Sequence, residues 1–293
     1  MHISNTLIFL LIFVFSSCSS EPNKINEKEV KSNLFFEHGT DSLMKKNYTE
    51  ALSALLKADE LWPDQTKVLN NLAMAYYLRG ARAEAIKYLK KSLDVDPKNS
   101  DARNNLASMY YEQGDLLKAE NEYQNVLKDL VYPNQFRTYY NLGLIKLRQG
   151  KLVEARQYFE SSLKENSNYC PAHFELGRQE FIFGQFKKAL KKFNDAIHGT
   201  CYNEPASHYY LGLTYLELKD YKKAQEKFNE IMAKFPNDEL SKKSITQLKR
   251  MEKSIPISEL NEGDKHKEEM DVLTEKKAAT KKEDRDLGQS PEF

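Results

Sequence analysis

The sequence predicts an all-α protein, a right-handed superhelical solenoid of six helix pairs followed by a C-terminal capping helix. Three observations favour this fold. The stretch from Tyr139 to Glu165 has the pattern of two short amphipathic helices joined by a turn at Gly150. Neither helix can bury its apolar stripe alone, so such a hairpin is stable only when it is stacked on copies of itself. Copies are present, because small and bulky residues recur along the chain about every 34 residues.

The register divides the chain into six units, and four positions of the unit carry the pattern. Small residues occupy position 8: Gly39, Ala73, Ala107, Gly143, Gly177 and Gly212. Turn glycines occupy position 15 of four units: Gly80, Gly114, Gly150 and Gly184. Alanines occupy position 20 of all six units: Ala51, Ala85, Ala119, Ala155, Ala189 and Ala224. Bulky residues occupy position 24: Leu55, Leu89, Tyr123, Phe159, Phe193 and Phe228. Small residues allow close approach of two helices, and the bulky residue one turn after the alanine fills the space between them.

This pattern resembles the tetratricopeptide repeat, whose period is about 34 residues. The predicted units are residues 32–65, 66–99, 100–135, 136–169, 170–204 and 205–238. Residues 239–252 place Leu240, Ile245, Leu248 and Met251 on one helical face, which predicts a helix that caps the last unit.

The amino end predicts a lipoprotein signal peptide over residues 1–17. An apolar run from Leu7 to Phe15 is too short to span a bilayer and fits the core of a secretory signal. Small residues then precede Cys18, and this resembles the lipobox of bacterial lipoproteins, in which the cysteine is lipidated. The alternative is an ordinary signal peptide or a membrane anchor with a chance cysteine. The polar residues 18–31 are interpreted as a flexible tether.

The composition argues against several classes of function. Lys and Arg number 44 and Asp and Glu 43, whereas binding to nucleic acid requires a clustered basic surface. Eight of the 11 glycines occupy repeat positions 8 or 15, which leaves no glycine-rich phosphate loop. The histidines are scattered, and His173 and His208 both fall at position 4, where core or boundary histidines are expected rather than metal ligands. We therefore expect no enzyme, no cofactor and no metal site.

The remaining cysteines, Cys170 and Cys201, stand at the start of the first helix of unit five and after its second helix. The two helices of a unit are antiparallel, so these ends lie side by side and a disulfide is feasible. Two unpaired cysteines are the alternative.

A two-residue insertion between units three and four carries a second resemblance. Val131-Tyr132-Pro133, followed by Asn141-Leu142-Gly143-Leu144, resembles the centre of the type IV pilus pilotin family, and Tyr111-Glu112-Gln113 and residues 155–163 also fit it. That resemblance implies a lipid-anchored protein on the periplasmic face of the outer membrane. It also implies a protein partner, the secretin subunit, whose assembly the family promotes, and it supports the Cys170–Cys201 pairing.

In tetratricopeptide repeats, the first helix of each unit lines a concave groove. The residues predicted to line it here are Asn70, Met74, Tyr77, Asn104, Tyr111, Tyr140, Leu144, Phe174, Arg178, Phe181 and Tyr209. Rings supply contact area and amides bind a peptide backbone, so this set suits an extended or helical peptide. Some of the rings are expected only to pack against the next repeat.

From residue 253 to 293 the chain is highly charged and has almost no aromatic residues, which predicts disorder; a partner-binding tail is the alternative. A monomer is expected. The competing function is that of a general envelope scaffold, which would recruit peptidoglycan hydrolases or outer-membrane assembly factors through the same groove.

Overall fold

The computed structural model describes residues 26–254, apart from the side chains of residues 199 and 200. The predictions for the signal peptide, for Cys18 and for residues 255–293 lie outside the described residues. Residues 253 and 254, assigned to the charged tail, are helical.

The described residues form thirteen α-helices and one short 3₁₀ helix, and they contain no strand. The elements are α1 (Glu27–Met44), α2 (Tyr48–Leu61), α3 (Thr66–Leu78), α4 (Arg82–Val95), α5 (Ser100–Glu112), α6 (Leu116–Val126), α7 (Gln135–Arg148), α8 (Leu152–Glu165), α9 (Cys170–Ile182), α10 (Phe186–Ala196), η1 (Gly199–Asn203), α11 (Pro205–Glu217), α12 (Tyr221–Lys234) and α13 (Glu239–Ser254). The all-α solenoid predicted from the repeat pattern is confirmed.

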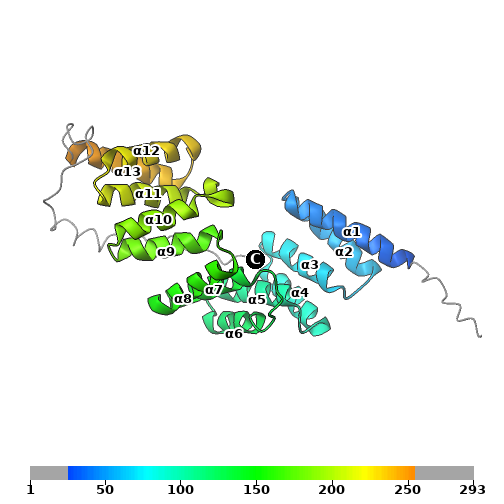
Figure 1. Ribbon diagram of the computed structural model, residues 1–293. Coiled ribbons are helices and arrows are strands. Elements are labelled where there is room, and N and C mark those ends of the chain that lie inside the picture. The colour runs from blue at the N-terminus through cyan, green and yellow to red at the C-terminus, as the bar shows by residue number, and fades with distance from the viewer. Residues whose placement is uncertain (1–25, 255–293) are drawn as a thin grey trace, which may run out of the picture.

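The helices follow one another along a curved array (Figure 1). Each helix packs on the helix before it and the helix after it. The first helices of the central units, α3, α5, α7 and α9, lie on the inner side of the curve, and their partners α4, α6 and α8 lie on the outer side. We call the inner surface made by the first helices the concave face.

The first helix starts earlier than the tether prediction allows. Helix α1 begins at Glu27, so residues 27–31, which we assigned to the tether, are helical. Asn26 caps the helix by accepting a hydrogen bond from the backbone N–H of Lys28, and Glu27 and Glu29 place negative charge at its positive end. A polar composition was therefore the wrong guide here, because capping and helix polarity favour a charged first turn.

The turn inside each unit needs a residue with a left-handed backbone. Gly80, Gly114, Gly150 and Gly184 adopt φ angles of 81°, 81°, 75° and 71°, a region that glycine enters without steric cost. The first and last units lack this glycine, and Lys46 and Lys219 take up the conformation instead, with φ angles of 63° and 62°. The terminal units therefore carry a local strain that the four central units avoid.

Close contact between the two helices of a unit explains the glycine at position 8. A Cβ atom added to Gly143 would lie 2.4 Å from a ring carbon of Phe159, and one added to Gly177 would lie 2.7 Å from the ring of Phe193. Both rings are fully buried, so they cannot move aside. The pairing of a small residue with a bulky one, predicted from the sequence, is the central packing contact of the unit.

The insertion between α6 and α7 is fixed by polar contacts. Asp129 accepts a hydrogen bond from the Ser100 hydroxyl at 2.6 Å, and the Tyr132 hydroxyl donates to Asp101 at 2.8 Å, so both ends of the segment are attached to α5. Between them, Leu130 and Val131 are 86% and 88% exposed.

The last helix covers the end of the array, as expected. Leu240 and Met251 of α13 are buried in a cluster with residues of α11 and α12, and Leu248 packs against the same cluster. Ile245, which we placed on this face, is 42% exposed and points away from it.

Candidate functional site on the concave face

The eleven residues predicted to line the groove all lie on the first helices α3, α5, α7, α9 and α11, but they differ in exposure. Five are partly exposed: Asn70, Met74, Tyr77, Arg178 and Phe181. Six are more than nine-tenths buried: Asn104, Tyr111, Tyr140, Leu144, Phe174 and Tyr209. More of the set than expected is thus engaged in packing, and four of the six buried residues stand at position 5 of their units: Asn104, Tyr140, Phe174 and Tyr209.

Asparagine side chains form hydrogen bonds between neighbouring first helices. The Asn105 amide donates to the Asn70 side-chain oxygen at 3.0 Å, which joins α5 to α3. The Thr138 hydroxyl donates to the Asn104 side-chain oxygen at 3.2 Å, which joins α7 to α5. Each of these side-chain oxygens therefore accepts a hydrogen bond between units. That the amides also bind a peptide backbone stays a prediction.

Aromatic rings connect the last two first helices, α9 and α11. Tyr210 of α11 packs edge-on against Phe174 and Phe181 of α9, with ring centroids 5.5 and 5.9 Å apart. Tyr210 stands at position 6 of its unit, which the sequence prediction did not include among the lining positions. Edge-to-face pairs of this kind stabilise a fixed arrangement of rings, so this part of the face is rigid.

A group of charged side chains lies between the aromatic residues. The guanidinium of Arg148 stacks on the Tyr111 ring, 3.8 Å from its centroid, and Nη1 donates to the Tyr111 carbonyl at 3.1 Å. On α9, Arg178 pairs with Glu175 at 3.2 Å, and Glu175 is only 1% exposed. We call Tyr111, Arg148, Glu175 and Arg178 the central cluster. Three first helices, α5, α7 and α9, contribute to it.

Sequence reasoning missed Arg148 and Glu175. Arg148 could have been predicted from the register, because it occupies position 13 of its unit, one of the positions that line the concave face. Glu175 occupies position 6, where the three preceding units carry Asn71, Asn105 and Asn141. Unit one also carries a glutamate at position 6, Glu37, but Glu37 is exposed whereas Glu175 is buried.

Burial changes the acidity of two tyrosines on this face. Burial raises the pKa of Tyr111 to about 12, even though the nearby Arg148 acts in the opposite direction. Burial, followed by the hydrogen bond that its hydroxyl donates to Glu112, also raises the pKa of Tyr77 to about 12. Both hydroxyls are neutral donors at physiological pH.

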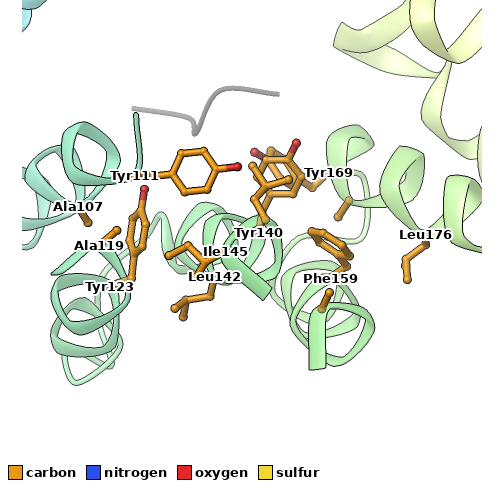
Figure 2. Close-up of a cluster of buried hydrophobic side chains, with 13 residues drawn as sticks. Ala107, Tyr111, Ala119, Tyr123, Tyr140, Leu142, Ile145, Phe159, Tyr169 and Leu176 are labelled. Carbon is orange, nitrogen blue, oxygen red and sulfur yellow. The ribbon is translucent and has the colours of Figure 1, made fainter. Parts of the chain in front are cut away.

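Figure 2 shows the packing beneath the central cluster. Tyr111 and Tyr140 project from α5 and α7, and their hydroxyl ends lie on the same side as that of Tyr169. Leu142 and Ile145 lie on the opposite side of α7, inside the array, and the centroid of the Phe159 ring of α8 lies 5.7 Å from that of the Tyr140 ring. Helix α7 thus presents Tyr140 to the concave face and aliphatic residues to the core.

The histidines at position 4 behave as structural residues. Nε2 of His173 donates to the carbonyl of Ser167, and Nε2 of His208 donates to the carbonyl of Tyr202, both at 2.8 Å. Across residues 26–254, no group of His, Cys, Asp and Glu side chains is arranged to hold a metal ion. Within that same range, the helices are too short or too polar to cross a bilayer.

The two cysteines of unit five are neighbours in space. Their Cα atoms are 6.1 Å apart, which is within the range that a disulfide requires, and the structure joins their sulfur atoms. The link connects the start of α9 to η1, the short helix that leads into α11. That the isolated protein carries this bond stays a prediction, tested below.

Surface depressions in the described residues also occur away from the concave face. One is lined by Lys46, Asn47, Tyr48, Thr49, Glu50 and Arg79, and a second by Lys31, Leu34, Phe35 and His38. Both lie mainly on unit one and neither contains a residue of the predicted groove.

Comparison with known proteins supports the repeat assignment directly. Family models of the tetratricopeptide repeat match residues 66–99, 100–164 and 205–238. The sequence is 37% identical over 62 residues to the type IV pilus assembly protein PilF of Pseudomonas aeruginosa. That match spans 20% of this chain and 25% of the relative, so it covers only a quarter of the curated protein's length.

Solved structures match over a much larger part of the chain. The PilF structure from Pseudomonas aeruginosa has a TM-score of 0.66 and 21% identity, covering 76% of this chain and all of that one. The structure of PilW, described as a widely conserved type IV pilus biogenesis factor, has a TM-score of 0.64 and 19% identity, covering 73% and 98%. A chain of the APC/C hetero-tetramer Cut9–Hcn1 has a TM-score of 0.65 and 16% identity, covering 74% and 42%.

The nearly equal TM-scores of these three structures show that the fold by itself does not select a partner. The covered lengths do separate the relatives, because PilF and PilW match from end to end whereas less than half of the Cut9–Hcn1 chain is matched. The chain contains tetratricopeptide repeats, is homologous in part of its sequence to PilF, and is similar in fold to PilF and PilW.

Proposed function

We propose that this protein is an outer-membrane lipoprotein of type IV pilus biogenesis, which binds the secretin subunit and promotes its localisation and multimerisation. The observation that carries the proposal is the agreement of sequence and fold: the chain that matches PilF in sequence also reproduces the whole length of the PilF and PilW structures. Neither a fold match nor a short sequence match would support it alone.

The proposed mechanism is binding and escort, with no bond made or broken. A segment of the secretin subunit would lie along the concave face, where the partly exposed Met74, Tyr77 and Phe181 supply apolar contact area. Arg178, also partly exposed, would hold an acidic or carbonyl group of that segment. The rigid aromatic packing around Tyr210 supports affinity, because a preformed surface loses little conformational entropy on binding.

Anchoring in this proposal depends on Cys18. The lipid attached there would hold the array at the periplasmic face of the outer membrane, and the bound secretin subunit would travel with it. More than one acyl chain is needed for stable anchoring. Replacing Cys18 with Ser should therefore release the protein from the membrane fraction and leave secretin subunits in the wrong membrane.

The experiment is a deletion strain complemented with matched variants. Deletion should leave secretin subunits unassembled and abolish pili, and the wild-type chain should restore both. Arg148→Glu, on the concave face, should restore neither, whereas Lys187→Glu, the same charge change on the second helix α10, should restore both. Normal secretin multimers in the deletion strain would refute the proposal.

The competing function is a general envelope scaffold, favoured by the equal fold similarity to a chain from an unrelated assembly. Affinity purification of the full-length lipoprotein from detergent-solubilised envelopes separates the two. Recovery of secretin supports the pilus function, and recovery of peptidoglycan hydrolases or outer-membrane assembly factors without secretin supports the scaffold.

A further inference from the structure

The central cluster combines cations with aromatic surface. Its two guanidinium groups outnumber its single carboxylate, Glu175, and both arginines lie against rings: Arg148 over Tyr111 at 3.8 Å, and Arg178 at 5.9 Å from Phe174 and from Tyr210. The three rings are more than nine-tenths buried, so they support the arginines from beneath. A peptide that suits this surface carries acidic side chains for the guanidiniums.

The chain itself contains such a peptide. Residues 283–293, EDRDLGQSPEF, hold four acidic residues against one arginine, together with Leu287, Pro291 and Phe293. The charge of the whole chain divides in the same way. Residues 26–254 contain 36 basic and 31 acidic residues, a net charge of +5, and residues 255–293 contain 7 basic and 11 acidic residues, a net charge of −4. The near-neutral total conceals two parts of opposite sign.

We propose that residues 283–293 bind the central cluster of the same chain and compete there with the protein partner. This inference rests on the concave face being the binding site of the proposed function. It assigns the C-terminal segment a regulatory role, as an internal ligand that occupies the face until the partner displaces it.

The segment is long enough to reach. Leu287 follows Ser254, the last residue of α13, by 33 residues, and an extended chain of that length spans about 110 Å. Helix α7 lies six helices before α13, which is about 60 Å at typical helix–helix spacings of 8–10 Å. Tethering gives such a segment an effective concentration on the order of 1 mM. A segment that binds with a dissociation constant of about 0.1 mM would then lower the apparent affinity for the partner about tenfold.

The experiment uses the full chain with the photoreactive residue p-benzoyl-phenylalanine in place of Leu287. Illumination should produce cross-links to α5, α7 or α9, mapped by peptide mass spectrometry. Mixing ¹⁴N- and ¹⁵N-labelled protein before illumination distinguishes the two routes, since cross-links within one chain contain a single isotope. Mixed-isotope cross-links would show that a second copy is the occupant, and cross-links to the outer helices α4, α6 or α8 would show non-specific contact; either result overturns the inference.

A matched pair of tail variants tests the role of charge without touching the folded array. Reversing Glu283, Asp284 and Asp286 to Lys should abolish the cross-links and raise the affinity for a secretin segment about tenfold. Reversing Glu268, Glu269 and Asp271 to Lys makes the same change in net charge and should leave the cross-links in place. Equal effects of the two variants would overturn the inference.

Different experimental outcomes would refute the proposed function and the internal ligand. If secretin does not bind but the cross-links form and respond to the first charge reversal, the partner is wrong and the internal ligand stands. If secretin binds the concave face and no specific cross-link forms, the internal ligand is wrong and the proposed function stands.

Discussion

Single residues decide how closely the two helices of a unit can pack. Position 8 is glycine in four units and alanine in the other two, and each phenylalanine at position 24 is paired with a glycine. Gly143 faces the ring of Phe159, whereas Ala73 belongs to the unit in which Leu89 fills that place. The methyl group of alanine thus fits beside Leu89 in unit two, whereas a Cβ at Gly143 would overlap the Phe159 ring.

Gly143→Ala should destabilise the protein by about 1–3 kcal/mol, because the new Cβ would overlap a buried ring that has no free space to move into. Adding Phe159→Leu should recover part of the loss, since the pair then has the composition found in unit two. Urea unfolding of the two single variants and the double variant measures this coupling. Strictly additive effects would show that the ring does not set the size limit.

The repeat pattern of single residues predicted the fold better than it predicted the contacts on the concave face. The register of Gly143, Ala155 and Phe159 predicted the fold, because a period of 34 residues is specified by packing alone. The concave face was predicted less well. Register places Tyr111 on that face, but it does not report that Arg148 covers the ring or that Asn104 bonds to Thr138. Such contacts cross between units and depend on which neighbours meet, so a repeat template cannot supply them.

At the scale of elements, the junction between units five and six is held by contacts of three different kinds. The η1 segment is joined to α9 through Cys170 and Cys201, to α11 through the His208–Tyr202 bond, and to α12 by Lys234, whose ammonium lies 3.9 Å from the centroid of the Tyr202 ring. Three helices thus hold a short irregular segment in place.

Replacing both Cys170 and Cys201 with Ser should lower the free energy of unfolding by about 3–4 kcal/mol, because the 31-residue separation makes the closed loop long enough to restrict the unfolded chain. Reductant should lower wild-type stability by a similar amount and leave the Ser variant unchanged. Alkylation followed by mass spectrometry of protein from the envelope provides the direct count, and two reactive thiols would contradict the pairing.

His208 should make this junction sensitive to mild acid. Its side chain is fully buried, and burial lowers its pKa, although the carboxylate of Glu230, 3.7 Å from Nδ1, acts in the opposite direction. Lys227 and Lys234 also favour the neutral ring. A histidine whose pKa is lower in the folded state takes up its proton more readily when unfolded, so stability is complete above the unfolded pKa of about 6.5 and falls as the pH drops below it.

The free energy of unfolding of the wild type should therefore fall between pH 7.5 and pH 5.5. His208→Gln keeps an N–H donor for the Tyr202 carbonyl but does not titrate, so its stability should change less over the same interval. His38→Gln, on the exposed surface of α1, serves as the control and should retain the wild-type slope. Glu230, whose pKa its two lysine partners lower to about 2 against the effect of burial, stays ionised throughout this range. A wild-type slope in the His208 variant would contradict the assignment.

At the scale of the whole molecule, the array is a chain of nearest-neighbour contacts, since each helix packs mainly on those adjacent in sequence. The two ends differ. Helix α13 covers the last unit with Leu240 and Met251, whereas α1, at the other end, buries only Ser32, Gly39 and Ser42 and leaves Leu34 61% exposed. The central helices α5 and α7 each bury nine residues. Stability should therefore be distributed unevenly along the array.

Native-state hydrogen exchange should reveal this order. Amides of α1 should exchange at least about tenfold faster than those of α5 and α7. Opening the uncovered end exposes little apolar surface and breaks only one interface between units, whereas opening a central unit breaks two. Gly143→Ala provides the internal control. It should accelerate exchange in α7 and α8 and in the helices that pack against them, and it should leave α1 unchanged, since α1 opens without disturbing unit four. Uniform protection along the array, or acceleration of α1 by that distant substitution, would show instead that the repeats open as one cooperative unit and that the exposed end has no separate weakness.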